Sequence, residues 1–321
     1  MEKTLKKRIP SRVNNSALVG IGYWGKVHFK YLNRNKKIII KKIYYSKNYK
    51  NILKLKIKEK STNNLRDILD DNSISHVDIV TPVETHAPLA IKFLKKNKNV
   101  LVEKPLILNK FEEMLIKKLQ KKNKKKLVTS YPYLFSKSLL LSKKIIQSNK
   151  LGKLRFIEIM IKQCGRFMKF DIKSLLAPHA ISIFSIFYNL NKIKIKSFDY
   201  IKNNNKKESL GLQCSLKNKI LGTASLSLNY ASDKNIKIIN LFCDKGTIIC
   251  DLGSNKYTIS SFKYQRVKKG RFKVAKIKKY IAKSFDEKNN MKYVIDDFFS
   301  KNKNQSNFRL TEKINEFMRN G

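Results

Sequence analysis

A glycine-rich turn between a predicted strand and a predicted helix constrains the fold of this chain more than any other feature. The apolar run Ala17–Gly20 leads into Gly20-Ile21-Gly22-Tyr23-Trp24-Gly25, and a helical pattern begins at Trp24. In such a G-x-G-x-x-G turn, the first glycine permits the bend, the second lets the backbone approach a pyrophosphate, and the third allows the helix to pack closely on the sheet. We expect Gly20, Gly22, Tyr23, Trp24 and Gly25 to bind a dinucleotide, the alternative being a plain strand-to-helix turn.

Short apolar runs and helical patterns alternate from Ala17 to about Pro132. The expected strands are Ala17–Gly20, Lys37–Tyr45, His76–Thr81, Asn99–Glu103 and Lys126–Ser130, with Leu53–Lys58 as a further short strand. The expected helices are Trp24–Asn33, Asn64–Asp71, Ala87–Lys95 and Phe111–Lys122. Because this alternation is typical of a doubly wound parallel sheet, residues 1–132 are predicted to form an α/β Rossmann domain.

Consecutive strands dominate the second half, so residues 133–321 are predicted to form an α+β domain for substrate binding and oligomerisation, with a large, mostly antiparallel sheet. The expected strands are Leu154–Lys162, Ile193–Ile201, Ser209–Leu216, Ile220–Asn229, Ile236–Phe242, Gly246–Asp251 and Tyr257–Phe262. The expected helices are Leu134–Ser148, Leu175–Leu190, Met291–Phe299 and Thr311–Arg319, the last two packing back on the first domain.

The net charge is +48, from 71 Lys and Arg against 23 Asp and Glu. A balance this basic normally indicates nucleic acid or an anionic membrane as partner. Only ten of the basic residues are Arg, and the Lys are spread along the chain with many Asn and Ile. We therefore expect no specific nucleic acid partner, and nonspecific polyanion binding at low salt remains the alternative.

Cysteine spacing and hydropathy narrow the class of protein further. The four cysteines show no Cys-x-x-Cys spacing, so no metal site is predicted. The basic N-terminus has no apolar stretch behind it, and no window reaches the roughly 20 apolar residues that cross a bilayer. The expectation is a cytoplasmic protein without a membrane partner.

The acidic residue that usually accompanies the glycine turn is absent. An Asp or Glu about 20 residues further on normally accepts a hydrogen bond from the adenosine ribose. No carboxylate occurs between Glu2 and Glu59, and the expected place holds Tyr44-Tyr45-Ser46-Lys47. Ser46 and Lys47 could bind a 2′-phosphate, which favours NADP slightly over NAD. The alternative is that both are ordinary surface residues.

A lysine stands where a later strand ends. Glu103-Lys104-Pro105 closes the apolar run Asn99–Val102. The carboxyl ends of parallel strands meet at one edge of a sheet, so the Lys104 ammonium would point into the same crevice as the glycine turn.

Together these motifs resemble the glucose-fructose oxidoreductase / inositol dehydrogenase (Gfo/Idh/MocA) family. That family has a Rossmann glycine turn, a Thr-Pro after the fourth strand, a Thr-His opening the next helix, and then Glu-Lys-Pro; this chain has Gly20–Gly25, Thr81-Pro82, Thr85-His86 and Val100–Pro105 in the same order. The resemblance implies an NAD(P)-dependent oxidoreductase acting on CH–OH groups, with Lys104 catalytic near the nicotinamide. It also implies cofactor contacts from Thr81, Pro82, His86, Glu103 and Lys104.

The resemblance extends into the second half, where it is closest to the branch of the family that acts on nucleotide sugars. Gly165-Arg166-Phe167 followed by Leu176-Ala177-Pro178-His179 is similar to that branch's Gly-Arg loop and Asp-Leu-Ala-Pro-His-Asp motif. It implies a sugar or nucleotide-sugar substrate, a role in surface polysaccharide biosynthesis, and a homo-oligomer. It further implies Arg166 as a substrate residue and His179 as an acid/base or substrate-hydroxyl partner.

Two positions depart from that branch. Leu175 stands where the branch has Asp four residues before the His, and Ala180 stands where Asp follows it. A His without a nearby carboxylate lacks the group that fixes its tautomer, and Asp171 would substitute if its loop folds back. The alternative hypothesis is therefore a catalytically degenerate family member that acts as a binding or regulatory protein.

Overall fold

The computed structural model describes residues 13–47, 49–163, 171–203, 206–230, 235–253, 258–267, 271–281, 290–300 and 308–320. Its contacts divide the chain into two units. The first comprises the described residues of Met1–Ser130 and Ile295–Phe308, and the second those of Tyr131–Val294 and Arg309–Gly321.

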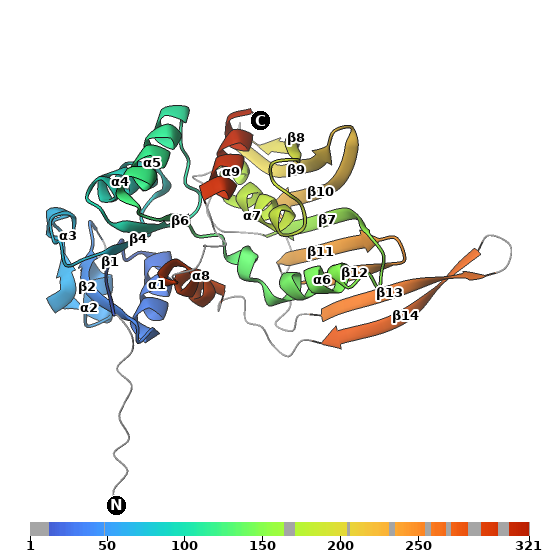
Figure 1. Ribbon diagram of the computed structural model, residues 1–321, viewed down its shortest axis with the longest axis horizontal. Coiled ribbons are helices and arrows are strands. Elements are labelled where there is room, and N and C mark those ends of the chain that lie inside the picture. The colour runs from blue at the N-terminus through green and yellow to red at the C-terminus, as the bar shows by residue number, and fades with distance from the viewer. Residues whose placement is uncertain are drawn as a thin grey trace, which may run out of the picture. The chain divides into compact units, whose positions relative to one another are not determined.

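Six parallel strands form the sheet of the first unit, in the order β3-β2-β1-β4-β5-β6 (Figure 1). They are β1 (Asn14–Val19), β2 (Ile38–Tyr44), β3 (Ser61–Thr62), β4 (His76–Ile79), β5 (Asn99–Val102) and β6 (Leu127–Thr129). Parallel strands are buried on both faces, and β1, β4 and β5 accordingly end in runs of buried residues. The strand order reverses between β1 and β4, which is where sheets of this class bind ligands.

Helices connect these strands. They are α1 (Tyr23–Arg34), α2 (Tyr49–Lys54), α3 (Arg66–Leu69), α4 (His86–Lys95) and α5 (Lys110–Asn123), with short 3₁₀ turns η1 (Lys58–Lys60) and η2 (Val83–Thr85). The strand predicted at Leu53–Lys58 is wrong: the end of α2 occupies its start, and Lys56 has a positive φ of 53°. A single buried residue, Ile52, anchors α2, so this region lacks the alternating burial that a strand needs.

A segment from the end of the chain completes the first unit. The ring of His76 lies against Phe298 and Phe299, with centroids 5.4 and 4.8 Å apart, and the Lys126 ammonium donates to the carbonyl of Ser300. These contacts involve the end of α8 (Asn290–Phe299). The last helix, α9 (Phe308–Asn320), instead belongs almost entirely to the second unit. The prediction that both terminal helices pack on the first domain is therefore right only for the second half of α8, from Ile295 on, because Asn290–Val294 belongs to the second unit.

The second unit contains an eight-stranded sheet in the order β14-β13-β12-β11-β7-β10-β9-β8. Its strands are β7 (Leu154–Lys162), β8 (Lys194–Asn203), β9 (Lys206–Leu216), β10 (Lys219–Ser227), β11 (Ile236–Cys243), β12 (Gly246–Asp251), β13 (Thr258–Val267) and β14 (Arg271–Ile281). All neighbours are antiparallel except β7 and β10. The predicted fold class is confirmed, although the sequence interpretation missed β14.

Two helices pack on this sheet. Helix α7 (Ile172–Phe187) contacts β7, β9 and β10, and α6 (Lys137–Gln147) contacts β12. The predicted helix Leu134–Ser148 is divided, because Pro132–Phe135 forms a 3₁₀ turn, η3, and Ser136 then caps α6 through its side chain.

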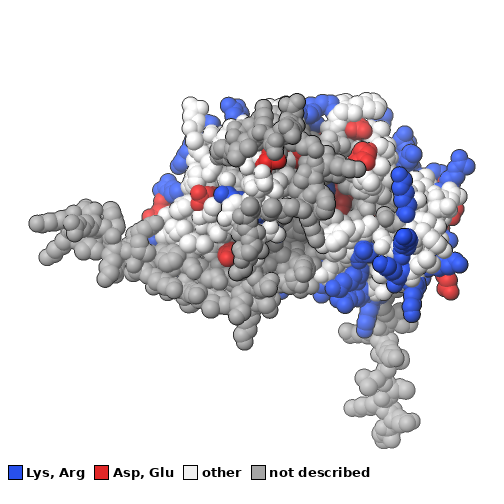
Figure 2. Space-filling view, turned by 180° about the vertical axis from the view of Figure 1, so that it is seen from behind, with Lys and Arg blue, Asp and Glu red and all other residues white. Residues whose placement is uncertain are grey.

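One face of the molecule shows how the lysine and arginine side chains of the described residues are arranged. Figure 2 shows them at many separate places on one face, with far fewer Asp and Glu among them. Within the part of the chain that the structure describes, no helix is both long and apolar enough to cross a membrane.

Candidate active site

The glycine turn follows β1, and its conformation depends on two glycines. Gly20 has a φ of +104°, and a Cβ there would lie 2.4 Å from the carbonyl oxygen of Val80. At Gly25, a Cβ would lie 2.3 Å from the carbonyl oxygen of Gly20. A side chain at either position would therefore push the backbone apart where β1, β4 and α1 meet.

The start of α1 suits an anionic ligand. Gly22 is the N-cap, it provides no side-chain cap, and the first turn of α1 contains no acidic residue. The unpaired N–H groups at a helix start attract phosphate when no carboxylate competes for them. Tyr23 and Trp24 lie in this turn with 58% and 52% of their surface exposed, and their rings meet edge to face. The donors and the glycine geometry fit a dinucleotide pyrophosphate.

The loop after β2 carries the residues predicted to select the cofactor. Ser46 and Lys47 directly follow this strand and are both exposed. β2 is the neighbour of β1, so its end lies on the same edge of the sheet as the glycine turn. No carboxylate occupies this loop, which leaves Lys47 as its charged group.

The end of β4 is held by hydrogen bonds within the chain. The hydroxyls of Thr81 and Thr85 lie 2.6 Å apart, and the Thr85 hydroxyl also donates to the carbonyl of Pro82 at 2.6 Å. His86, the first residue of α4, is buried. Its Nε2 lies 2.8 Å from the Thr81 carbonyl and its Nδ1 lies 3.0 Å from the Pro105 carbonyl. The cofactor contact predicted for His86 therefore has no ring nitrogen available, and the imidazole instead joins two segments of backbone.

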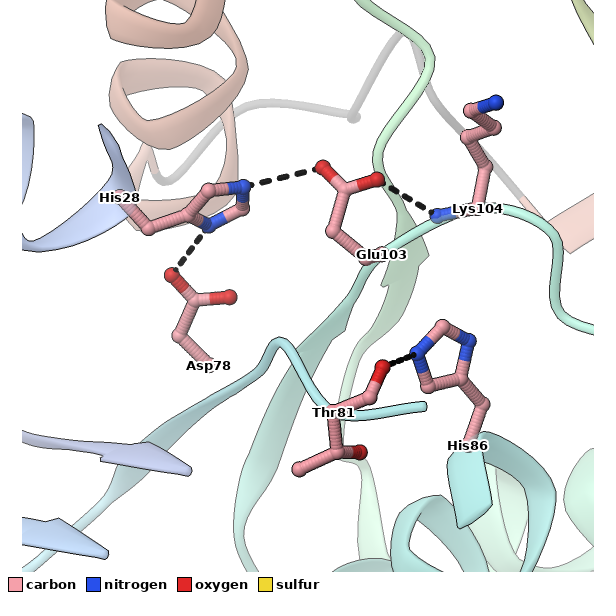
Figure 3. A network of polar contacts seen from close by, with 6 residues as sticks. All are labelled: His28, Asp78, Thr81, His86, Glu103 and Lys104. Atoms are coloured by element: carbon pink, nitrogen blue, oxygen red, sulfur yellow. Dashed lines mark hydrogen bonds and ion pairs between the residues drawn. The ribbon is translucent and has the colours of Figure 1, made fainter. Parts of the chain in front are cut away.

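A buried ionic network lies behind Glu103-Lys104-Pro105, whose Lys104–Pro105 peptide bond is cis. Figure 3 shows His28 between two carboxylates: Nδ1 is 2.7 Å from Asp78 and Nε2 is 2.9 Å from Glu103. The second oxygen of Glu103 accepts the backbone N–H of Lys104 at 3.0 Å. Glu103 is thus buried, and its carboxylate fixes the backbone at Lys104.

Burial and charge set the ionisation of this network. Burial lowers the pKa of His28, but Asp78 and Glu103 outweigh that effect and raise it to about 10. Burial raises the pKa of Asp78, with His28 offsetting only part of the rise, and its second carboxylate oxygen has no hydrogen-bond partner among the described residues. Burial also opposes ionisation of Glu103, yet its hydrogen bond to His28 prevails and its pKa is lowered. His28 is therefore an imidazolium that donates from both nitrogens.

Lys104 follows β5 on the same edge of the sheet as the glycine turn. Its side chain extends away from His28 and Glu103 in Figure 3 and is partly buried. Burial lowers the pKa of the Lys104 ammonium, and the charge of Glu103 offsets part of this change. The ammonium of Lys104, with its lowered pKa, therefore lies at this end of β5.

The predicted substrate residues lie in the second unit. His179 is on α7, and its ring meets that of Tyr133 edge to face with centroids 5.0 Å apart. Asp171 is the N-cap of α7, and its side chain accepts the backbone N–H of Lys173. It precedes His179 by two helical turns, roughly 12 Å along the axis, so it does not replace the carboxylate missing beside that histidine. Arg166 lies outside the described residues.

Two members of the network were not predicted from the sequence. His28 lies three residues after Gly25 on the buried face of α1, and Asp78 interrupts the apolar strand β4. A carboxylate inside a buried strand needs a partner, and this was the signal that could have revealed the pair. No group of three or more His, Cys, Asp and Glu side chains among the described residues is placed to hold a metal ion.

Comparison with known families agrees with the geometry of the first unit. The family model of Gfo/Idh/MocA, described as an oxidoreductase family with an NAD-binding Rossmann fold, matches residues 14–131. Residues 14–131 form a Rossmann domain of Gfo/Idh/MocA type. Oxidoreductase P35 of Formosa agariphila is 32% identical over 103 residues, which are 32% of this chain and 32% of that protein. The chain thus matches about a third of the length of this relative.

Solved structures of Gfo/Idh/MocA type share the fold over almost the whole chain. Levoglucosan dehydrogenase in complex with NADH and levoglucosan has a TM-score of 0.77 at 16% identity, covering 96% of this chain and 97% of that one. UDP-N-acetylglucosamine 3-dehydrogenase of Acidithiobacillus ferrooxidans has a TM-score of 0.74 at 13% identity, covering 94% and 93%. At these identities the likeness concerns the fold, which therefore continues through the second unit.

Proposed function

We propose that this chain is an NAD(P)-dependent oxidoreductase that transfers hydride between a nicotinamide and a carbinol carbon of a sugar. The observation that carries the proposal is the sheet edge of the first unit. There, an acid-free helix start follows β1, and Lys104, with its lowered pKa, follows β5. The first feature suits a dinucleotide and the second suits a substrate oxygen that changes charge.

The cofactor is proposed to lie along this edge. Gly20–Gly25 would hold the pyrophosphate through backbone N–H groups, and Tyr23 and Trp24 would cover it. Ser46 and Lys47 would hold the adenosine ribose or its 2′-phosphate, which gives a slight preference for NADP. When bound, the nicotinamide supplies the acceptor or donor of the hydride.

Lys104 is proposed to polarise the substrate hydroxyl. A positioned ammonium stabilises the negative charge that grows on the oxygen as the carbon–hydrogen bond breaks. Burial lowers the pKa of Lys104, which brings its proton exchange closer to neutral pH, where acid–base help is most effective. Backbone contacts on either side of Lys104, to Glu103 and His86, fix the position from which the side chain acts.

His179 is proposed to exchange the hydroxyl proton, and Arg166 and Asp171 to contribute to substrate binding. The ring of Tyr133 limits the orientations open to the imidazole of His179. Leu175 and Ala180 supply no carboxylate to this histidine. We expect slower turnover than a histidine paired with a carboxylate would give.

The substrate is proposed to be a sugar or a nucleotide sugar, and the setting to be surface polysaccharide biosynthesis. Support comes from structures of the same fold, one named for levoglucosan and one for UDP-N-acetylglucosamine. The Gly165-Arg166 motif favours a nucleotide sugar, since an arginine can hold a diphosphate through two parallel hydrogen bonds.

The test is a panel of sugars and nucleotide sugars mixed with NAD or NADP, with reduced cofactor followed by absorbance. Lys104→Met should lower kcat by about 10²-fold or more while the cofactor Kd changes by less than about threefold, because the ammonium acts on the substrate oxygen. Lys92→Met, on the exposed surface of α4, is the matched control and should match the wild type. Tight cofactor binding without turnover of any substrate would refute the proposal that this chain is an enzyme.

A second candidate function is a binding or regulatory protein that kept the fold. It is favoured by Leu175 and Ala180 beside His179, and by the use of Asp171 as a helix cap. Calorimetric titration with sugars in the presence of NAD or NADP separates the two functions. Sugar binding without hydride transfer supports the regulatory protein, whereas turnover supports the enzyme.

A further inference from the structure

The Glu103-Lys104-Pro105 segment is held by side chains that lie behind it. Glu103 is buried, and its two oxygens have different tasks: one meets His28 at 2.9 Å and the other accepts the Lys104 N–H at 3.0 Å. The carboxylate therefore links a charged ring on α1 to the backbone amide of the proposed catalytic lysine.

His28 is held in turn from its other side. Its second ring nitrogen is 2.7 Å from Asp78 in the middle of the sheet, and both His28 and Asp78 are almost fully buried. A ring that donates to two carboxylates is held in one orientation. The Nε2–H that Glu103 accepts is therefore fixed in place. The chain of contacts runs from β4 through α1 to the end of β5.

We infer that His28 is a positioning residue for Lys104, acting through the Glu103 carboxylate on the backbone from which the lysine side chain projects. The inference deepens the proposed function and rests on it for the catalytic role of Lys104. The Pro105 carbonyl, which lies 3.0 Å from the buried His86, holds the far side of the same segment. The contacts thus fix the main chain on both sides of Lys104.

Removing this support should loosen the segment without disturbing the glycine turn. In Glu103→Gln, the His28–Asp78 pair remains, and the amide has one accepting oxygen in place of the two that meet His28, the Lys104 N–H and Ser130. In His28→Gln combined with Asp78→Asn, two opposite charges leave together, which avoids two facing carboxylates without a cation. Either variant leaves Gly20 and Gly25 unchanged, so cofactor binding should persist.

The decisive measurement is hydrogen exchange of the Lys104 amide, read by mass spectrometry on overlapping peptides across residues 100–108, where Pro105 contributes no amide. We expect exchange about 10- to 100-fold faster in Glu103→Gln and in the double variant, since a charge-assisted hydrogen bond is lost. We also expect kcat to fall at least about tenfold, with the cofactor Kd within about threefold of the wild type.

His76→Gln provides the matched control, because it replaces a second imidazole, on β4, whose contacts run to Ser75, Asn99 and α8. It should leave the Lys104 amide and kcat unchanged. Unchanged exchange in the folded Glu103→Gln and double variants would overturn the inference, as would an equal effect in the control. If exchange rises as expected but the wild type turns over no substrate, the positioning role stands and the proposed function fails.

Discussion

The four histidines of the chain occupy four different electrostatic environments. His28 lies between two carboxylates, His86 between two carbonyls, and His179 against a tyrosine ring. His76 is neutral, because burial first, and then Lys126 and Lys125, lower its pKa to about 4. Their sequence neighbours do not predict these differences, which arise from residues brought together by the sheet.

We expect these differences to appear in a titration of histidine-labelled protein by nuclear magnetic resonance. The His28 signal should stay in the charged form until the pH approaches about 10, and the His76 signal should stay neutral until the pH approaches about 4. The pKa of His28 would lie nearer 6.5 if the network were absent, whereas that of His76 would not change. The variants His28→Gln and His76→Gln assign the two signals, and a His28 signal that titrates near pH 6.5 would contradict the network.

The raised pKa of His28 makes the stability of the first unit depend on pH. Protonation of this ring contributes to folding in full below about pH 6.5, its unfolded value, and the contribution is lost as the pH rises through about 10. The first unit should therefore become less stable across this alkaline range.

At the scale of elements, the sequence predicted most of what positions the site. The glycine turn, the five main strands of the first sheet and the connecting helices other than α2 were predicted because their patterns are local. Leu53–Lys58 alternates apolar and Lys residues as a strand would, yet it is not one, and β14 was missed, because a strand is stabilised by neighbours that are distant in sequence. The His28–Asp78–Glu103 network was missed for the same reason, because its members come from three elements.

The two leading glycines of the turn should respond differently to alanine. Gly20→Ala should destabilise the first unit by about 1–2 kcal/mol or more, because φ is positive there and Val80 blocks a Cβ. Gly22 has a φ of −71°, which alanine adopts readily, so Gly22→Ala should fold normally and bind the cofactor at least about tenfold more weakly. Thermal unfolding and calorimetric titration measure the two effects. Full affinity in Gly22→Ala would argue against a pyrophosphate at this turn.

The loop after β2 should decide between the two nicotinamide cofactors. Lys47→Glu should weaken NADP binding at least about tenfold and leave NAD binding within about threefold, because only NADP carries the 2′-phosphate. Lys54→Glu makes the same charge change on the exposed surface of α2 and serves as the control. The comparison is the ratio of the two Kd values in each variant. An equal ratio in both variants would show that Lys47 does not bind the 2′-phosphate.

At the scale of the whole molecule, one face of the eight-stranded sheet suits pairing between copies. Helix α7 covers the other face, where the ring of Phe184 packs so closely on Gly222 that no side chain would fit there. On the open face, Phe198 and Phe242 are 43% and 37% exposed. They lie on β8 and β11, with β7, β10 and β9 between them, and exposed apolar residues spread over one sheet face favour an interface between copies.

We expect a homo-oligomer that depends on this face. Light scattering after size exclusion should show an oligomer for the wild type and a shift toward monomer for Phe198→Lys combined with Phe242→Lys, since burying two charges there is unfavourable. Phe111→Lys, at a residue of α5 that is 72% exposed, should not change the mass. A monomeric wild type would rule out the interface.

The first unit is discontinuous in sequence, which affects both its folding during synthesis and the choice of a fragment for expression. The described residues of Ile295–Phe308 belong with a sheet encoded before residue 131, so a ribosome must finish nearly the whole chain before that sheet gains these contacts. An expressed fragment that stops at the first domain boundary would leave His76 without the rings of Phe298 and Phe299. A fusion of residues 13–130 to this late segment through a short linker is the better starting point for an isolated nucleotide-binding domain.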